Sequence, residues 1–175
     1  MTDQTPEAIT QQTPIAEADR FLRMEPVVVR REDSLERLAH LAVENTGCRV
    51  LSVVDDDGRL VGVVPVRVLV NDIFLKIVPE EFLGEIVDME AVMKYAEHVG
   101  ARTAGDIMLE PVAVRRDETV RDAFRRMHEA RLNGLPIIDD ERRVVGHVDQ
   151  LELLLVWVHA TGRHGLLEPP SDGAR

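Results

Sequence analysis

The apolar positions in the first half of the chain alternate between short β-branched runs and a helical spacing. Val27–Val29 directly follow a proline, which suits a strand whose first residue donates no ladder hydrogen bond. After Ser34, apolar residues recur at i, i+3, i+4 and i+7, which predicts an amphipathic helix with Ser34 as its N-cap. The runs Val50–Val54 and Leu60–Val64 flank an acidic turn and predict a β-hairpin, and Val66–Val70 predicts a second, weaker helix. The predicted order is therefore β-α-β-β-α.

The same order recurs in the second half of the chain. Pro26–Leu35 (PVVVRREDSL) matches Pro111–Val120 (PVAVRRDETV) 85 positions later, and Leu51–Gly62 matches Leu135–Gly146 84 positions later. Repeats of this length and order indicate two copies of one supersecondary unit, each too small to bury a core alone. We therefore expect an α/β (α+β) fold of two β-α-β-β-α units related by a pseudo-twofold axis, with Thr119 as the second N-cap.

A third region separates the two repeats. Pro79 and the two glutamates after it suit the first turn of a helix. The apolar residues that follow share one helical face, which we expect to cover the core or a partner subunit; they are Phe82, Ile86, Met89, Met93 and Ala96. The polar composition of both chain ends is typical of mobile tails. The expected boundaries are an N-terminal tail at 1–19, repeat one at 20–70, a helical insert at 71–103, repeat two at 104–160 and a C-terminal tail at 161–175.

Composition and charge exclude several functions. The 175 residues include 21 Lys+Arg against 32 Asp+Glu, a net charge of −11, and only 3% aromatic residues. This surplus repels phosphate backbones and leaves no stacking platform, so nucleic acid is not an expected partner. Apolar stretches fall short of the roughly 18 residues that a membrane span needs, and the first residues resemble no signal peptide. We expect a cytoplasmic protein without membrane insertion, with Cys48 as a buried, inert thiol.

The sequence carries no familiar catalytic signature. Its six histidines show neither HxxxH nor HExxH spacing and have no cysteine partners, which argues against zinc. The motifs GxGxxG, GxxxxGK(S/T) and GxSxG do not occur. Asp55–Gly58 lacks the alternation of an EF-hand loop and suits a hairpin turn. We therefore expect a non-enzymatic protein with no metal site and no required cofactor.

In its repeated element order and several short motifs, the chain resembles the tandem cystathionine-β-synthase (CBS) domain pair, also called a Bateman module. The likeness rests on Asp106–Met108 (DIM) before a Pro-Val pair, on Asn133–Asp139 (NGLPIID) and on Val145–Val148 (VGHV). Repeat one carries looser versions, with Ser52 where the family usually has proline. The resemblance implies two sheets stacked around a pseudo-twofold axis, with two clefts for adenosine-containing ligands such as AMP, ADP, ATP or S-adenosylmethionine. It also implies a homodimer shaped as a flat disc.

The resemblance further implies which residues touch the ligand. The family places a Ser or Thr three residues after the glycine of the last strand, where its hydroxyl can meet a phosphate, and an Asp three residues later, where it accepts the ribose hydroxyls. Repeat one has Pro65 and Val68 at these positions, which can make neither contact. Repeat two has Asp149 and Glu152, so ribose binding is retained while Asp149 would repel a phosphate about 4 Å away by roughly 1 to 4 kcal/mol. Asp149 can also cap the last helix. We therefore place the ligand in the second cleft, lined by Met108, Pro111, Val112, Asn133, Gly134, Leu135, Pro136, His147, Asp149, Glu152, Arg49 and Arg131.

Three functions remain open at the level of sequence. The favoured one is a regulatory sensor that binds an adenine nucleotide or nucleoside and signals to an unknown regulated protein through its dimer. The second is a dimerising interaction module with degenerate, empty clefts, which Pro65, Val68 and Asp149 suggest. The third is a divalent-cation sensor built from the acidic turns and the insert.

Overall fold

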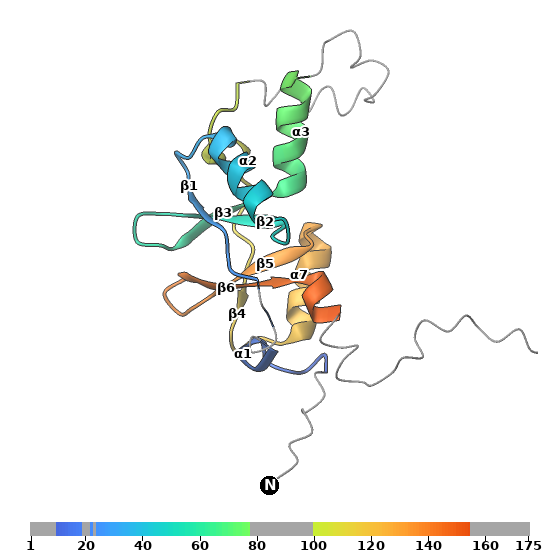
Figure 1. The fold of residues 1–175 in the computed structure, drawn as a ribbon. Helices are drawn as coiled ribbons and strands as arrows, with labels where there is room; N and C mark the ends of the chain where they lie inside the picture. The colour runs from blue at the N-terminus through green and yellow to red at the C-terminus, as the bar shows by residue number, and fades with distance from the viewer. Residues whose placement is uncertain (1–9, 19–21, 23, 78–99, 155–175) are drawn as a thin grey trace, which may run out of the picture.

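Two three-stranded sheets lie one above the other in the computed structural model (Figure 1). The structure describes residues 10–18, 22, 24–77 and 100–154. The two helices that follow the first strand and the hairpin of repeat one lie above its sheet, on the side away from the other sheet (Figure 1). The predicted α/β class with two similar units is therefore confirmed.

Repeat one has the predicted β-α-β-β-α order. Its elements are β1 (Val28–Arg30), α2 (Leu35–Glu44), β2 (Val50–Val54), β3 (Leu60–Pro65) and α3 (Val66–Ile77). The sheet order is β1-β2-β3, with β1 parallel and β3 antiparallel to β2. A parallel neighbour needs a crossover connection, which α2 supplies, whereas the antiparallel neighbour needs only a hairpin turn.

Repeat two has the same topology. Its elements are β4 (Val114–Arg115), α7 (Val120–Ala130), β5 (Gly134–Ile138) and β6 (Val144–Asp149), followed by the start of a helix at 150–154. The sheet order is β4-β5-β6, again with one parallel and one antiparallel pair. Both hairpins have a register shift near their turns, between Val53 and Val54 and between Ile137 and Ile138. The repeat seen in the sequence is thus a repeat of hydrogen-bond pattern as well.

The two predicted N-caps are confirmed. The Ser34 hydroxyl accepts the N–H of Arg37 at 3.2 Å. The Thr119 hydroxyl accepts the N–H of Asp122 at 3.2 Å, and the Asp122 carboxylate accepts the N–H of Thr119 at 3.1 Å, which completes a capping box. The hydrogen bonds from the hydroxyl and the backbone of Thr119 hold the pKa of the Asp122 carboxyl below its ordinary value.

Removal of the Thr119 cap should therefore destabilise α7. We expect Thr119→Ala to lower the free energy of unfolding by about 1 kcal/mol, because a first-turn N–H loses its acceptor. Urea unfolding at neutral pH measures the change. Thr119→Ser keeps the hydroxyl and serves as the control, with a loss of only a few tenths of a kcal/mol expected. An equal loss in both variants would show that the methyl group, not the cap, carries the effect.

The short helix that leads into each repeat packs on the other repeat. In α1 (Ile15–Ala18), Ile15 and Ala18 are fully buried in the apolar cluster of repeat two, and the N–H of Ile15 donates to Glu118 O at 2.8 Å. In α6 (Ala104–Ile107), both end residues are buried in the cluster of repeat one, and the N–H of Ala104 donates to Asp33 O at 2.8 Å. Residues 15–18, expected within a mobile tail, are thus part of the core of repeat two, because two apolar side chains cover it.

Part of the expected insert falls outside the described residues. Helix α3 continues to Ile77, beyond the five residues predicted to be helical. The helix expected to start at Pro79 lies within 78–99, which the structure does not describe, as do 1–9 and 155–175 at the chain ends.

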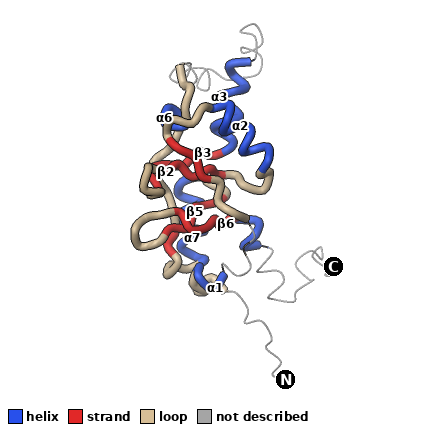
Figure 2. Tube along the Cα trace, turned by 60° about the vertical axis from the view of Figure 1, so that its left-hand side comes forward, coloured by secondary structure: helices blue, strands red, loops and turns tan. Residues whose placement is uncertain are grey.

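The inner faces of the two sheets meet at the centre of the molecule. Side chains alternate along β2, so that Leu51 and Val53 pack in the core of repeat one, while Val50 belongs to the apolar cluster of repeat two. Strand β2 lies against β5, and Figure 2 shows the sheet of repeat one directly above that of repeat two. The β2–β3 and β5–β6 hairpins are joined through hydrogen bonds from Leu60 N–H to Arg142 O at 2.9 Å and from Val144 N–H to Gly58 O at 3.4 Å. The two repeats therefore share one interface along their hairpins.

Candidate functional site

Polar groups from both repeats meet where β6 ends. We call this region the Glu152 junction and define it by Met24, Arg49, Asp149 and Glu152. The backbone N–H of Met24, just before β1, donates to Glu152 Oε1 at 3.0 Å. Arg49, just before β2, places Nε 3.9 Å from Asp149 Oδ2. Two residues of repeat one thus contact the two carboxylates of repeat two that the sequence singles out.

The position of Asp149 follows from the end of β6. The strand ends at this residue and a helix begins at 150. Asp149 Oδ1 accepts the N–H of Leu151 at 2.7 Å, which satisfies an N–H of the first helical turn. Its other oxygen, Oδ2, has no hydrogen-bond partner among the described residues. The helix-capping role is therefore present, and it engages only one of the two carboxylate oxygens.

Burial dominates the electrostatics of this junction. Asp149 has 0% exposure and Glu152 has 9%. Burial raises the pKa of the Asp149 carboxyl, while the Leu151 N–H and the Arg49 guanidinium lower it in part. Cys48 is buried as predicted, and desolvation raises the pKa of its thiol, with a smaller contribution from the nearby Asp149 charge. The Arg49 side chain is half-exposed, and its guanidinium reaches the buried Asp149 carboxylate from the surface.

The corresponding region of the other repeat is different. We call it the Arg67 junction and define it by Arg67, Arg131 and Leu109. Arg67 Nη2 donates to the carbonyl oxygen of Arg131 at 3.4 Å, and Leu109 exchanges two backbone hydrogen bonds with Val63, at 2.8 and 3.1 Å. Leu109 corresponds to Met24 in the repeat register, and Val68 corresponds to Glu152. This junction therefore has Pro65 and Val68 where the Glu152 junction has its two carboxylates, and its polar side-chain contact is that of the Arg67 guanidinium.

His147 lies on the inner face of repeat two. It pairs with Pro136 across β5 and β6, and its counterpart Val63 packs in the cluster shared between the sheets. The imidazole is 1% exposed, and neither ring nitrogen has a hydrogen-bond partner in the described part of the chain. Desolvation lowers its pKa from 6.5 to about 4. Ser52 on β2 is likewise fully buried with an unpartnered hydroxyl, so the centre of the interface holds two neutral polar groups.

Gly134 makes room for this imidazole. A Cβ at position 134 would lie 2.7 Å from His147 Nε2 and 3.1 Å from the carbonyl oxygen of Val148. Repeat one has Val50 and Val63 at the two corresponding positions. A small and a large residue in repeat two thus replace two medium-sized residues in repeat one.

The residues expected to line one cleft fall in several places. The structure brings Arg49, Asp149 and Glu152 together at the Glu152 junction. Arg131 is at the Arg67 junction, and Met108 packs against Gly62 of repeat one. The remaining residues lie within repeat two: Gly134, Leu135, Pro136 and His147 are buried, Pro111 and Val112 are half-buried, and Asn133 is exposed with its carbonyl bound to the N–H of Gln150.

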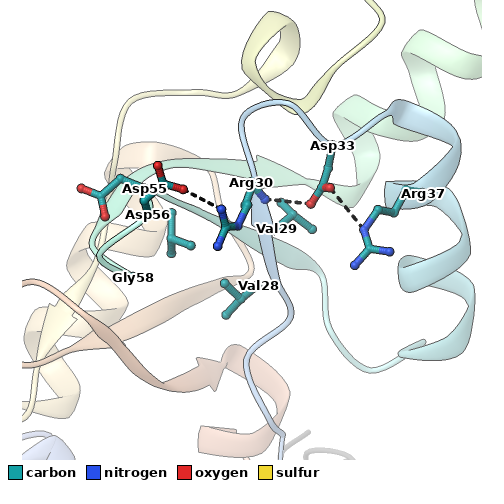
Figure 3. Close-up of a pocket in the computed structure, with 9 residues that line it drawn as sticks. Val28, Val29, Arg30, Asp33, Arg37, Asp55, Asp56 and Gly58 are labelled. Carbon is teal, nitrogen blue, oxygen red and sulfur yellow. Dashed lines mark hydrogen bonds and ion pairs between the residues drawn. The ribbon is translucent and has the colours of Figure 1, made fainter.

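A separate cavity of about 430 Å³ lies on the outer edge of repeat one (Figure 3). It is lined by Val28, Val29, Arg30, Asp33, Arg37, Val54, Asp55, Asp56 and Gly58. Four of its charged residues, Arg30, Asp56, Asp33 and Arg37, are engaged in two contacts with one another or with the backbone beside them. Arg30 Nη1 lies 2.5 Å from Asp56 Oδ1, and Asp33 accepts the N–H of Arg30 at 2.8 Å and lies 3.3 Å from Arg37 Nε.

The same pairing occurs at the corresponding edge of repeat two. There Arg115 pairs with Asp140 in the β5–β6 turn, as Arg30 pairs with Asp56 in the β2–β3 turn. These side chains are largely exposed, and exposed ion pairs contribute little stability. The repetition indicates that the pairs fasten each hairpin to the first strand of its sheet, so the cavity is a weaker candidate site than the Glu152 junction.

Met24 is a residue of this candidate site that could not be found from the sequence. Its contribution is a backbone N–H, which leaves no signature in side-chain chemistry. The repeat register offered an indirect signal, because the residues before each first strand occupy equivalent positions.

Within the described ranges, no group of three or more His, Cys, Asp or Glu residues could hold a metal ion. No helix in that part of the chain is long and apolar enough to cross a membrane.

Two β-α-β-β-α repeats that face each other through their sheets define a tandem repeat module. The CBS domain family matches residues 15–74 and 104–158, more than half of the chain. The chain therefore belongs to the CBS domain family and carries two CBS domains, a Bateman module. No curated protein sequence matches it significantly.

Solved structures share this fold. A CBS domain-containing protein from Thermotoga maritima has a TM-score of 0.66 at 23% identity, covering 83% of this chain and 94% of its own. A CBS domain pair in complex with 5′-methylthioadenosine and S-adenosyl-L-methionine has a TM-score of 0.60 at 20% identity, covering 84% and 97%. CBSX2 in complex with AMP has a TM-score of 0.61 at 22% identity, covering 85% and 98%. Similar CBS pairs thus bind adenosine compounds.

Proposed function

We propose that this protein is a non-catalytic sensor that binds an adenosine-containing ligand at the Glu152 junction. Ligand binding would change the conformation of a homodimer, and this change would be the signal to a regulated protein. The observation that carries the proposal is the position of Glu152. Its carboxylate stands where the family carries its ribose-binding acid, and it contacts the opposite repeat through the N–H of Met24. A ligand held there would touch both repeats and could favour one relative orientation of them.

Hydrogen-bond chemistry supports ribose at this position. A carboxylate accepts several hydrogen bonds, and bonds to a charged acceptor are stronger than bonds between neutral groups. Glu152 Oε1 already accepts one backbone N–H, which orients the carboxylate. Adenosine compounds bound to similar CBS pairs support the ligand class.

Exposed apolar residues support a homodimer. Val43 on α2 and Val70 on α3 are 74% and 55% exposed, and Leu151 and Leu154 in repeat two are 51% and 49% exposed. Val70 and Leu154 occupy equivalent positions in the two repeats. Apolar residues exposed at equivalent positions of both repeats are suited to association with a second copy of the chain.

A thermal-shift and calorimetric series tests the ligand site. AMP, ADP, ATP, adenosine and S-adenosylmethionine are compared on the unmodified protein and on Glu152→Ala. We expect at least one compound to raise the melting temperature, and Glu152→Ala to bind it about 10-fold or more weakly, because a charge-assisted hydrogen bond contributes about 1.5–3 kcal/mol. Glu141→Ala, in the exposed β5–β6 turn, is the matched control and should bind as the unmodified protein does. An unchanged affinity in Glu152→Ala would move the site elsewhere.

A ligand-free dimerisation module is the second candidate. The observation that favours it is the internal use of the junction carboxylates, since Asp149 is fully buried and caps a helix while Glu152 accepts the Met24 N–H. This function predicts a stable dimer in size measurements and no response to any adenosine compound at millimolar concentration. A ligand response would exclude it.

A further inference from the structure

Repeat two holds an arginine side chain at its outer edge. Arg126 of α7 donates from Nη1 to the carbonyl oxygen of Ala113 at 2.5 Å and to Glu118 Oε2 at 2.6 Å, and its Nη2 donates to Glu118 Oε1. Both carboxylate oxygens are thus engaged, and the Arg126 side chain is only 31% exposed. The backbone before β4 and the carboxylate before α7 therefore form a binding place for a guanidinium group.

Repeat one has the same two acceptor positions and lacks the arginine. In the repeat register Val28 corresponds to Ala113, Asp33 to Glu118 and Leu41 to Arg126. Val28 and Asp33 both line the cavity of about 430 Å³ at the outer edge of repeat one (Figure 3). A cavity in repeat one thus borders the counterparts of the two residues that hold a guanidinium in repeat two.

The backbone acceptor of this cavity is free. Val27 O accepts the N–H of Ser52 at 2.8 Å, and successive carbonyl groups of a strand point in opposite directions, so the carbonyl of Val28 points away from β2. Within the described residues, no side chain donates a hydrogen bond to it. The counterpart of the Ala113 carbonyl is therefore open to a donor.

The Asp33 carboxylate is held only loosely by a side chain. Figure 3 shows it between Arg30 and Arg37. Its Oδ2 accepts the backbone N–H of Arg30 at 2.8 Å, as Glu118 accepts that of Arg115. Arg37 lies 3.3 Å from Oδ1 through Nε alone, and its side chain is 61% exposed. Exposed ion pairs contribute little stability, so a second guanidinium can displace this contact.

We propose that the cavity at the outer edge of repeat one binds a guanidinium group from outside the chain, in the place that Arg126 takes in repeat two. Asp33 and the Val28 carbonyl accept its N–H groups, which suits the planar, many-donor guanidinium better than a single ammonium. The half-exposed Val28 side chain can pack against an alkyl stem. The group comes from free arginine or from an arginine side chain of a partner protein. This site is separate from the Glu152 junction and does not depend on adenosine binding.

Amide spectra of the ¹⁵N-labelled protein test the site with three probes. Nα-acetyl-L-arginine N-methylamide mimics arginine within a polypeptide, L-arginine is the free amino acid, and the citrulline counterpart of the first probe lacks the charge. We expect saturable shifts of the Arg30 and Gly58 amides, with the citrulline probe binding about 10-fold or more weakly, because it offers no charged donor to Asp33. Tighter binding of L-arginine than of the blocked probe identifies the free amino acid as the source. Equal or weaker binding identifies a partner's side chain.

Four variants test the geometry with the blocked arginine probe. Asp33→Asn keeps an oxygen for the backbone N–H that the carboxylate binds, and should weaken the probe about 10-fold or more. Arg37→Ala removes a competing like charge and should tighten it at least about twofold. Leu41→Arg should abolish binding, because its own guanidinium then fills the cavity. Glu44→Gln, an exposed carboxylate at the other end of α2, is the control and should change nothing.

Several results would overturn the proposal. They are the lack of a saturable shift with either arginine compound, a citrulline probe that binds as tightly as the arginine probe, and unchanged binding in Asp33→Asn. Weaker binding in Arg37→Ala would also overturn it, because the Arg37 guanidinium would then belong to the binding site. Asp33→Asn and Arg37→Ala keep the test decisive if Leu41→Arg disturbs α2. None of the probes contains adenosine, so failure here leaves the proposed function untouched.

Discussion

Acidification from about pH 7 to about pH 4 should lower the free energy of unfolding by about 3 kcal/mol through His147 alone. The cause is the burial of this imidazole between the two sheets, with 1% exposure and no hydrogen-bond partner for either nitrogen among the described residues. The pKa of His147 is lowered from 6.5 to about 4 in the folded protein. Each unit of pKa difference between the folded and unfolded states corresponds to about 1.4 kcal/mol.

The sign follows from which state holds the proton. Between about pH 6.5 and pH 4 the unfolded chain protonates this histidine while the folded chain does not, so the unfolded state gains stability as the pH falls. The contribution is fully present above about pH 6.5 and is lost by about pH 4. Asp149, two residues farther along the same face of β6, opposes this trend, because a raised carboxyl pKa makes the folded state bind protons more readily. Pro136, which pairs with His147 across β5 and β6, carries no charge.

Urea unfolding at a series of pH values measures the effect. The matched control is His147→Val, because repeat one has Val63 at the corresponding position. The difference in unfolding free energy between the two proteins isolates His147 from the carboxylates, and it should change by about 3 kcal/mol between about pH 7 and pH 4. Parallel pH profiles for the two proteins would contradict the buried, unpartnered position of the imidazole.

Substitution of Gly134 should cost about 1–3 kcal/mol of unfolding free energy. In Gly134→Ala the new Cβ would lie 2.7 Å from His147 Nε2 and 3.1 Å from the backbone oxygen of Val148. The imidazole cannot move away easily, because it is packed between two sheets, so the added methyl group overfills the interface. Gly100→Ala is the control, since a Cβ there meets no atom within 4 Å.

A double-mutant cycle identifies the clash with His147 as the cause. We expect Gly134→Ala to cost less in the His147→Val background, with a coupling of about 1 kcal/mol, because the shorter side chain leaves space for the added methyl. Urea unfolding of the four proteins at pH 7 gives this value. A coupling near zero would assign the whole effect to the Val148 carbonyl and would contradict the compensation between Gly134 and His147.

The fold could be predicted from the sequence because its determinants are local and occur twice. Ser34 and Thr119 mark helix starts through hydrogen bonds to the first turn, and the acidic turns mark hairpins. The packing of α1 and α6 onto opposite repeats could not be predicted in the same way. Ile15 and Ala18 show no periodicity, and only the tertiary structure reveals that the core of repeat two needs their side chains.

The sequence could identify the two carboxylates of the candidate site, but it could not show which residues of repeat one contact them. The positions of Asp149 and Glu152 follow from their spacing after Gly146 in the repeat. The pairing of Arg49 with Asp149 crosses between repeats, and the Met24 contact uses a backbone group, so neither depends on local sequence pattern. His147 was expected to contact the ligand, and the structure places it in the inter-sheet core, because the two-residue period of β6 turns it toward repeat one.

The central claim is that an adenosine compound binds against Glu152, between the two repeats. The most direct measurement is the backbone amide spectrum of the ¹⁵N-labelled protein during titration with S-adenosylmethionine, adenosine and AMP. A ligand that engages the Glu152 carboxylate must change the environment of the Met24 N–H, which donates to it at 3.0 Å. We predict that the Met24 and Glu152 amides shift with one common dissociation constant and that Glu152→Ala abolishes the shift. Two results would contradict the claim: saturable shifts confined to the residues that line the cavity at the outer edge of repeat one, or no shift with any of the three compounds.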